Sequence, residues 1–251
     1  MNATIHKLDS ARPQGADAPH DDIDVDPTEL AAVRAALDGK LLARLKLGAR
    51  ALRGILRHPD DTRQVFTLFL VMNAKHIPGF LARFIAEPGA VALLHEQPAL
   101  DSRSVDFAAL ARLPADTLGG AYARHLSTRG LSPDIFKAPP GVPPTIAYLA
   151  QRLRQSHDVW HVITGYDTSV DDELALLAFS YQQSKMPGPA LLATVGAVRF
   201  SLQYPGVIAK VRDGFRRGKA ARSLIAVRWE DLWTTPLAEV RERFAIEPRR
   251  A

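Results

Sequence analysis

The sequence predicts an all-α protein that forms a single, mainly helical domain. Apolar residues recur at three- and four-residue spacings along most of the chain, and proline and glycine punctuate these runs. Alternating runs typical of strands are scarce. With 251 residues, 47% of them hydrophobic, the chain is long enough to bury a core. We find no linker within residues 28–251 and expect one domain there.

The ends of the chain differ in charge. Residues 1–27 carry two basic residues against six aspartates and have no apolar periodicity, which predicts a disordered acidic tail. The tail has a net charge of −4 and the whole chain +5, so the remainder carries +9. A basic body suits an anionic membrane surface, but without a recognition motif we expect no nucleic-acid partner. No secretory or import signal is visible, and the default expectation is a cytoplasmic protein.

Helices are expected in order along the chain. Leu41–Leu56 forms the first amphipathic run, and Pro78-Gly79 and Pro88-Gly89 separate two short helices after it. The next run should break at Gly119-Gly120 before Tyr122.

The C-terminal part holds the best strand candidate, the alternating segment SLIAVRW at Ser223–Trp229. It runs directly into a helical pattern from Pro236. One mainly helical domain remains the simplest interpretation.

A helix that starts near Thr145 and ends at Thr164-Gly165 carries a group of polar residues in its last turns. His157 and His161 are four residues apart and therefore share a face, and Asp158 lies three residues before His161. Three metal-ligand side chains thus lie close together. The chain has no cysteine, so nitrogen and oxygen must supply all ligands.

A short loop then leads to the next helix, where Ser169 and Asp172 have the spacing of a capping box. Helices joined by so short a loop pack as antiparallel neighbours, which brings Glu173 back toward His161. Two imidazoles and two carboxylates predict one divalent ion, either zinc, iron or manganese. Solvated histidines on an ordinary helix would show the same spacing, and Asp158 could instead orient an imidazole without binding the metal.

These residues form a motif: HD-x-x-H, then eleven residues, then E. This motif is the signature of the Coq4 family of ubiquinone biosynthesis proteins, which this chain resembles. Its four positions are His157, Asp158, His161 and Glu173. The resemblance extends to DTLGGAYARHLSTRGLSPD before the motif, and to MPGPALLATVGAVRF and VRWEDLWTTPLAEVRERF after it. It covers roughly residues 40–247. The chain departs from many members at Asp172 and Ser180.

The resemblance implies a metal-dependent enzyme that removes the C1 carboxylate of a polyprenylated 4-hydroxybenzoate precursor and installs a hydroxyl there. The four motif residues would be both metal ligands and catalytic residues. Arg152 and Arg154 match the family's basic pair, and we expect them to bind substrate. The alternative is a non-enzymatic lipid-binding scaffold that organises a biosynthetic complex.

Several partners follow from the same resemblance. They are the polyprenylated aromatic substrate, other ubiquinone biosynthesis proteins, a second copy of the chain in a homodimer, and a membrane surface. A polyprenyl chain needs an apolar lipid-binding cavity that opens toward the bilayer. Two segments are candidates for the membrane-facing entrance: Phe80, Leu81, Phe84 and Ile85 beside Arg83, and the Leu191–Phe200 helix with Arg199 near its end. The expected location is cytoplasmic and bacterial-type, peripheral to the inner membrane.

Overall fold

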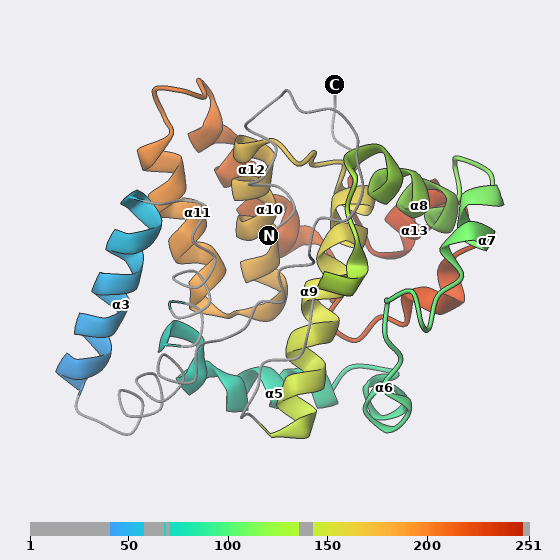
Figure 1. Cartoon of the computed structure of the whole chain (residues 1–251), viewed down its shortest axis with the longest axis horizontal. Coiled ribbons are helices and arrows are strands. Elements are labelled where there is room, and N and C mark those ends of the chain that lie inside the picture. Colours follow the sequence, from blue (N-terminus) through green and yellow to red (C-terminus); the bar gives the residue numbers. More distant parts are fainter. Residues whose placement is uncertain (1–40, 58–67, 69–70, 136–142, 248–251) are drawn as a thin grey trace, which may run out of the picture.

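The computed structural model describes residues 41–57, 68, 71–135 and 143–247. These residues form helices, and among them no strand is present (Figure 1). The expected all-α, single-domain fold is confirmed. The expected tail, residues 1–27, lies outside the described part of the chain. The α-helices are α3 (Leu41–Arg57), α5 (Ile77–Ile85), α6 (Ala90–Glu96), α7 (Phe107–Arg112), α8 (Leu118–Arg129), α9 (Pro144–Thr164), α10 (Val170–Ser184), α11 (Pro187–Arg199), α12 (Val207–Ala220) and α13 (Leu237–Arg243).

The strand expected at Ser223–Trp229 is wrong. The segment is a non-helical connection that leads into a short 3₁₀ helix, Trp229–Leu232. Its apolar side chains enter two different parts of the core: Leu224 and Trp229 pack in one cluster, and Ile225 in another. Leu224, Ile225 and Ala226 are buried in succession, so the segment crosses the core as a connection without the alternating burial of a strand.

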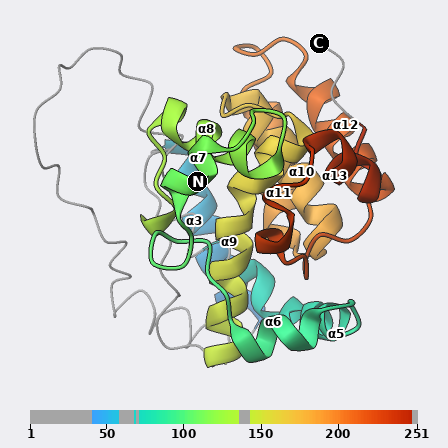
Figure 2. The ribbon, with the colours of Figure 1, turned by 90° about the vertical axis from the view of Figure 1, so that its right-hand side faces the viewer.

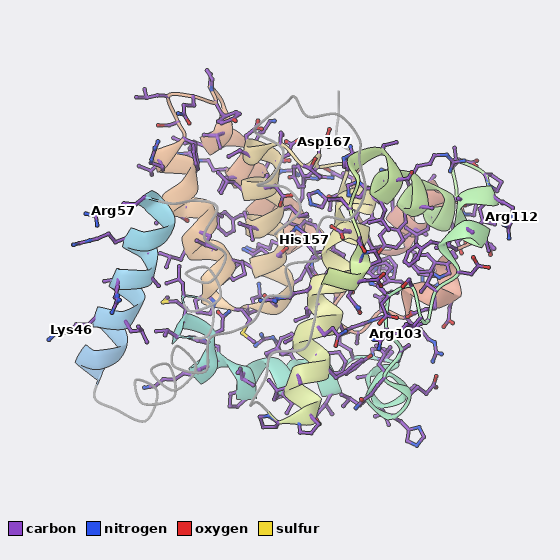
Figure 3. All side chains as sticks on the ribbon, in the orientation of Figure 1. Lys46, Arg57, Arg103, Arg112, His157 and Asp167 are labelled. Atoms are coloured by element: carbon purple, nitrogen blue, oxygen red, sulfur yellow. The ribbon has the colours of Figure 1, made fainter. Side chains whose placement is uncertain are left out.

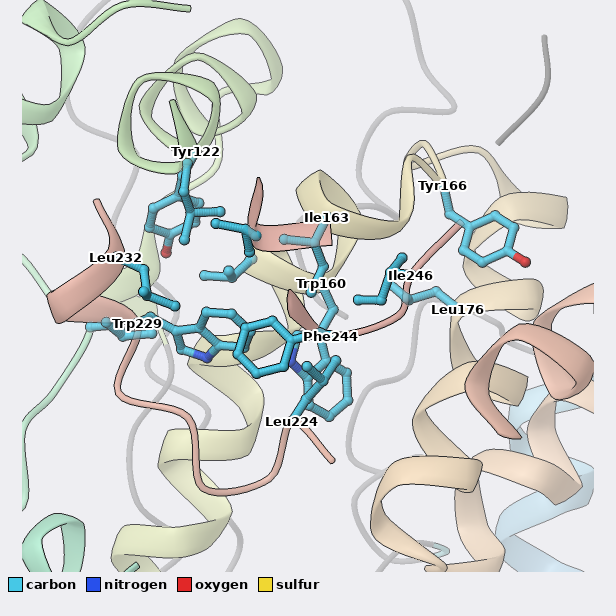
Figure 4. Close-up of a cluster of buried hydrophobic side chains, with 14 of the residues drawn as sticks. Tyr122, Trp160, Ile163, Tyr166, Leu176, Leu224, Trp229, Leu232, Phe244 and Ile246 are labelled. Carbon is cyan, nitrogen blue, oxygen red and sulfur yellow. The ribbon is translucent and has the colours of Figure 1, made fainter. Parts of the chain in front are cut away.

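The larger core cluster lies where α8, α9 and α10 meet the C-terminal segment (Figure 4). Trp229 is fully buried and its ring lies 5.8 Å from that of Phe244. Trp160 and Ile163 point into the same cluster from α9, the helix that carries the two motif histidines. Burial of several aromatic side chains around one helix fixes its position in the fold.

Helices α10 and α12 pack closely because two glycines on α12 face α10. A Cβ on Gly214 would lie 2.1 Å from the backbone oxygen of Ala175, and one on Gly218 would lie 2.7 Å from that of Phe179. No larger residue fits at this separation. The position of α10, and of Glu173 at its start, therefore depends on α12.

The connection between α9 and α10 is as short as the sequence predicts. Helix α9 ends at Thr164, and Gly165 follows in the left-handed region with φ +76°. The chain then turns back, and α10 runs alongside α9 in the opposite direction (Figures 1 and 2). Ser169 is the N-cap residue of α10, but its hydroxyl bonds Asp171 and makes no capping bond to the backbone. Its partner in the expected capping box, Asp172, accepts a hydrogen bond from the backbone of Asp167.

The break expected at Gly119-Gly120 is also wrong. Both glycines lie inside the first turn of α8, which Thr117 caps by accepting a bond from the Gly120 amide. A Cβ on Gly120 would lie 2.1 Å from the backbone oxygen of Pro114. These glycines therefore allow close packing.

Among the described residues, no single helix is long and apolar enough to cross a membrane. One sharply bent pair, Val71–Ile85 with Ala90–Glu96, passes the same test by length and composition alone.

Candidate metal centre

Two histidines from the end of α9 and a glutamate from the start of α10 meet in one cluster. Each of His157, His161 and Glu173 offers a ligand atom, and these atoms all lie within 4.8 Å of one another. We call these three residues the triad. Figure 3 shows His157 in the middle of the molecule, on α9. The predicted approach of Glu173 to the two histidines is therefore present in the structure.

The carboxylate of Glu173 bridges the two imidazoles. His157 Nε2 lies 3.3 Å from Glu173 Oε2, and His161 Nε2 lies 3.1 Å from Oε1. The two imidazole rings are almost perpendicular, at 89°, with centroids 4.8 Å apart. Side-chain exposure is 1% for His161, 12% for Glu173 and 15% for His157. The cluster is buried and remains partly open on the side of His157.

Asp158 is not brought into the triad. Its carboxylate is buried, yet it is not among the ligand atoms that cluster within 4.8 Å. Adjacent residues of a helix point about 100° apart, so Asp158 and His157 cannot present their side chains in the same direction. Burial raises the pKa of Tyr122 and the charge of Asp158 adds to this rise, while for His161 the charge of Asp158 adds a smaller effect to that of Glu173. This arrangement favours the alternative in which Asp158 supports the ligands.

Burial and the charges of the neighbouring triad residues shift the pKa values of all three side chains. Burial alone would raise the pKa of Glu173, but the charges and hydrogen bonds of His161 and His157 hold it well below its ordinary value. Burial would lower the pKa of His161, and the carboxylate of Glu173 outweighs this effect and raises it. For His157 burial dominates and the pKa is lowered. The surroundings therefore favour the charged form of His161 over that of His157.

His161 is held in one tautomer by the backbone. Its Nδ1 donates to the carbonyl oxygen of Tyr166 at 2.9 Å, which directs Nε2 toward Glu173. This is the arrangement that metal-bound histidines adopt, because the second nitrogen must carry the proton. The residues present therefore fit a divalent ion: two imidazole nitrogens and one carboxylate oxygen converge, and a backbone acceptor fixes one imidazole.

Tyr166 itself is fixed by α12. Arg217 is 4% exposed, its guanidinium lies 4.7 Å from the centre of the Tyr166 ring, and it donates to the carbonyl oxygens of Thr164 and Glu247, each at 2.6 Å. The Tyr166 hydroxyl donates to Asp213 at 2.9 Å. The αL cap at Gly165 is the only sequence signal for this turn. The arginine comes from a position 53 residues away, and local sequence gave no sign of it.

A third histidine lies against the triad. His125 of α8 stacks on His161 with ring centroids 5.3 Å apart, and it is 7% exposed. Burial, and then the neighbouring His161, lower its pKa to about 3, so it is neutral at ordinary pH. Its sequence surroundings gave no reason to choose it.

A cavity of about 330 Å³ lies on this side of His161, with polar and apolar walls that include His125, Arg124, Arg129 and Leu237. Neither His157 nor Glu173 lines it. The expected apolar lipid-binding cavity stays a prediction.

The two arginines expected to bind substrate differ in their surroundings. Arg152 is buried and forms a two-pronged ion pair with Glu230, at 2.6 and 2.8 Å, and also donates to the carbonyl oxygens of Pro98 and Val227. These contacts favour a structural role for Arg152. Arg154 is half-buried, burial lowers its pKa, and it lies one helical turn before His157.

The chain matches the family model for coenzyme Q (ubiquinone) biosynthesis protein Coq4 over residues 36–250. It is 30% identical over 213 residues to the protein named ubiquinone biosynthesis protein coq4, mitochondrial, of Aspergillus fumigatus, covering 80% of this chain and 72% of that protein. The similarly named protein of Coprinopsis cinerea is 31% identical over 167 residues, or 65% of this chain. The chain spans 57% of the length of the Coprinopsis protein and 53% of the length of the similarly named protein of Laccaria bicolor.

A crystal structure described as a putative ubiquinone biosynthesis protein from Nostoc punctiforme has a similar fold, with a TM-score of 0.64 and 29% identity over 84% of this chain and 98% of that one. The names of the fungal relatives place them in mitochondria, which differs from the bacterial-type location expected for this chain. The family match covers nearly the whole described chain and includes the triad. The chain therefore belongs to the Coq4 family of coenzyme Q (ubiquinone) biosynthesis proteins.

Proposed function

We propose that this chain is an enzyme of ubiquinone biosynthesis that replaces the C1 carboxylate of a polyprenylated 4-hydroxybenzoate-derived precursor by a hydroxyl group at a membrane surface, with release of carbon dioxide and with dioxygen as the two-electron oxidant. The observation that carries the proposal is the triad: two imidazole nitrogens and a carboxylate oxygen within 4.8 Å, in a buried and partly open position. Zinc, iron and manganese all accept such ligands.

The number of ligands favours a catalytic site over a structural one. Structural zinc sites are closed by four protein ligands, whereas three ligands leave positions for water or substrate. Two histidines and one carboxylate with open positions are also the donor set typical of non-heme iron enzymes that use oxygen. A bound divalent ion would supply a positive charge to the substrate carboxylate and, if it is iron, a means of using oxygen.

The protein's own residues would divide the remaining tasks. His157, His161 and Glu173 hold the ion, and Asp158, the fourth motif residue, supports them from the buried side. Arg154 lies one turn from His157, where its cation could pair with the substrate carboxylate. A substrate role for Arg152 requires release of its ion pair with Glu230, so we assign the role to Arg154 first.

Membership of the family implies other proteins of the ubiquinone pathway as partners. The polyprenyl tail of the proposed substrate partitions into a bilayer, so the protein would work at its surface, where a homodimer could also form.

The test uses precursor labelled at the carboxylate carbon, full-length metal-loaded protein and oxygen. We expect labelled carbon dioxide from the unchanged protein and none from Glu173→Ala. Glu239→Ala, an exposed glutamate of α13, is the matched control and should retain activity. If Glu173→Ala is folded and still releases label at the normal rate, the enzyme proposal is wrong. A scaffold would instead release no label with any variant and would keep its protein partners.

A further inference from the structure

One turn of the molecule exposes an unusual amount of apolar surface. The large apolar side chains that are strongly exposed in the described residues are Ile85, Val91, Val198, Leu202 and Ile208. Three of these lie around the turn from α11 to α12, where Leu202 is 94% exposed and Val198 69%. We call residues 194–212 the α11–α12 tip. Of the membrane-facing residues expected on α5, Phe80 and Phe84 are 3% and 1% exposed and belong to the core, Leu81 is partly buried against it, and Ile85 is 51% exposed.

The tip is also free of acidic residues. It contains Arg199, Lys210 and Arg212 and no aspartate or glutamate. Lys210 is used inside the protein, where it pairs with Asp171 and with Asp172 at 2.8 Å. Arg199 and Arg212 are exposed. The first acidic residue after the tip, Asp213, pairs with Arg216 at 2.8 Å, so the exposed charges within the tip are those of Arg199 and Arg212.

Helix α3 continues this basic surface. Its 17 residues include five basic and no acidic side chains. One side of the helix packs inward through Gly48 and Ala51, and Ala51 shares a core cluster with Leu192 and Ala197 of α11. The exposed residues of the helix include the basic side chains Lys46, Arg50, Arg53 and Arg57. None of these four takes part in the ion pairs found among the described residues.

The basic helix and the apolar tip lie on the same flank of the molecule. Figure 3 shows α3 standing beside α11, with Arg57 at the end of α3 that is closer to the tip. The α5–α6 corner, with Ile85 and Val91, lies at the opposite end in both ribbon views (Figures 1 and 2). The two exposed apolar regions therefore cannot face the same plane.

The tip also lies next to the triad end of α10. The pair between Lys210 and Asp172 joins the start of α12 to the residue before Glu173. Gly196 of α11 faces the side chain of Leu174, the residue after Glu173. The tip and the triad therefore lie at the same end of α10.

We propose that the α3 flank and the α11–α12 tip dock on an anionic lipid bilayer, with Val198 and Leu202 entering the acyl boundary and the arginines of α3 contacting the headgroups. A bilayer meets both features at once, because it offers an anionic surface directly above an apolar interior. An acidic protein would match the cations but not the apolar turn. The proposal rests on the proposed function for its purpose, but its test needs neither substrate nor metal.

The test is sedimentation of the full chain with phosphatidylcholine vesicles that contain or lack phosphatidylglycerol. Binding should require the anionic lipid and weaken as sodium chloride rises. Leu202→Glu should weaken binding about tenfold, and Arg50→Glu with Arg53→Glu about thirtyfold or more, because each basic residue near the surface contributes about a fivefold change in binding. The matched controls are Val91→Glu, at a residue 72% exposed on α6, and Arg112→Glu, at an exposed residue of α7.

Three results would overturn the docking surface. One is equal binding to neutral and anionic vesicles. Another is loss of binding with Val91→Glu and not with Leu202→Glu, which would place the membrane at the α5–α6 corner. A third is Leu202→Glu separating a dimer in size-exclusion chromatography while vesicle binding is unchanged, which would assign the tip to a second copy. Metal content is measured on the same samples. If the docking surface is wrong but the metal is present, the proposed function is unaffected.

Discussion

Replacement of Glu230 by glutamine tests whether Arg152 is a structural residue. The side chain of Arg152 is 3% exposed and that of Glu230 20%, so the change would leave an almost fully buried cation without its carboxylate. Breaking a buried pair costs ~3–5 kcal/mol, and because water can reach Glu230 we expect the lower end, about 3 kcal/mol. The carbonyls of Pro98 and Val227 remain as partners, which also limits the loss.

For a chain of this length, that loss corresponds to a fall in Tm of roughly 6–12 °C. Urea and thermal unfolding of Glu230→Gln would measure it. The matched control is Glu96→Gln, because Glu96 pairs with Arg228 on the surface, where both side chains are at least 35% exposed. Surface pairs contribute ~0–1 kcal/mol, so the control should be nearly neutral.

A double variant, Arg152→Met with Glu230→Gln, should recover much of the loss, because the uncompensated charge is gone. Equal small effects of Glu230→Gln and Glu96→Gln would show that the Arg152–Glu230 pair is not a buried structural contact. If Glu230→Gln is stable and only substrate binding changes, Arg152 is a substrate residue as the family resemblance implies.

Two further changes test the packing and the acid response. Gly214→Ala should destabilise the protein by ~1–3 kcal/mol, because its Cβ would lie 2.1 Å from the backbone oxygen of Ala175. The control Gly79→Ala, whose Cβ would lie 3.8 Å from its nearest neighbour, should be neutral. Equal unfolding midpoints for the two variants would contradict this prediction. The pKa of His125 in the folded protein is about 3, below its ordinary value, so on acidification the unfolded chain takes up the proton first. The free energy of unfolding therefore falls by about 1.4 kcal/mol per pH unit below about pH 6.5. His125→Phe should reduce this slope in urea unfolding at matched metal loading, and an unchanged slope would show that His125 is not its source.

The parts of the site that the sequence could predict are those determined locally. The four-residue spacing of His157 and His161 and the glycine after Thr164 predicted one face and one helix end. The short loop predicted that α10 returns to α9 and brings Glu173 to the histidines. Asp158 shows the limit of this reasoning, because sequence distance alone does not say on which flank of a helix a side chain lies.

The remaining features depend on contacts between distant parts of the chain. Arg152 meets Glu230 across 78 residues, and Arg217 reaches Thr164 across 53. Neither pairing has a local sequence signal. The strand expected at Ser223–Trp229 failed for the same reason: Leu224, Ile225 and Ala226 are all buried by distant elements, and no partner strand lies beside them among the described residues.

Binding of one divalent ion by His157, His161 and Glu173 is measured by elemental analysis of the protein purified without chelators or metal-affinity resin. We expect one ion of zinc, iron or manganese per chain, loss of that ion in His161→Ala, and its retention in His95→Gln, an exposed histidine of α6. An unchanged protein that contains no metal even after incubation with these ions, or His161→Ala with a full equivalent, would contradict this expectation.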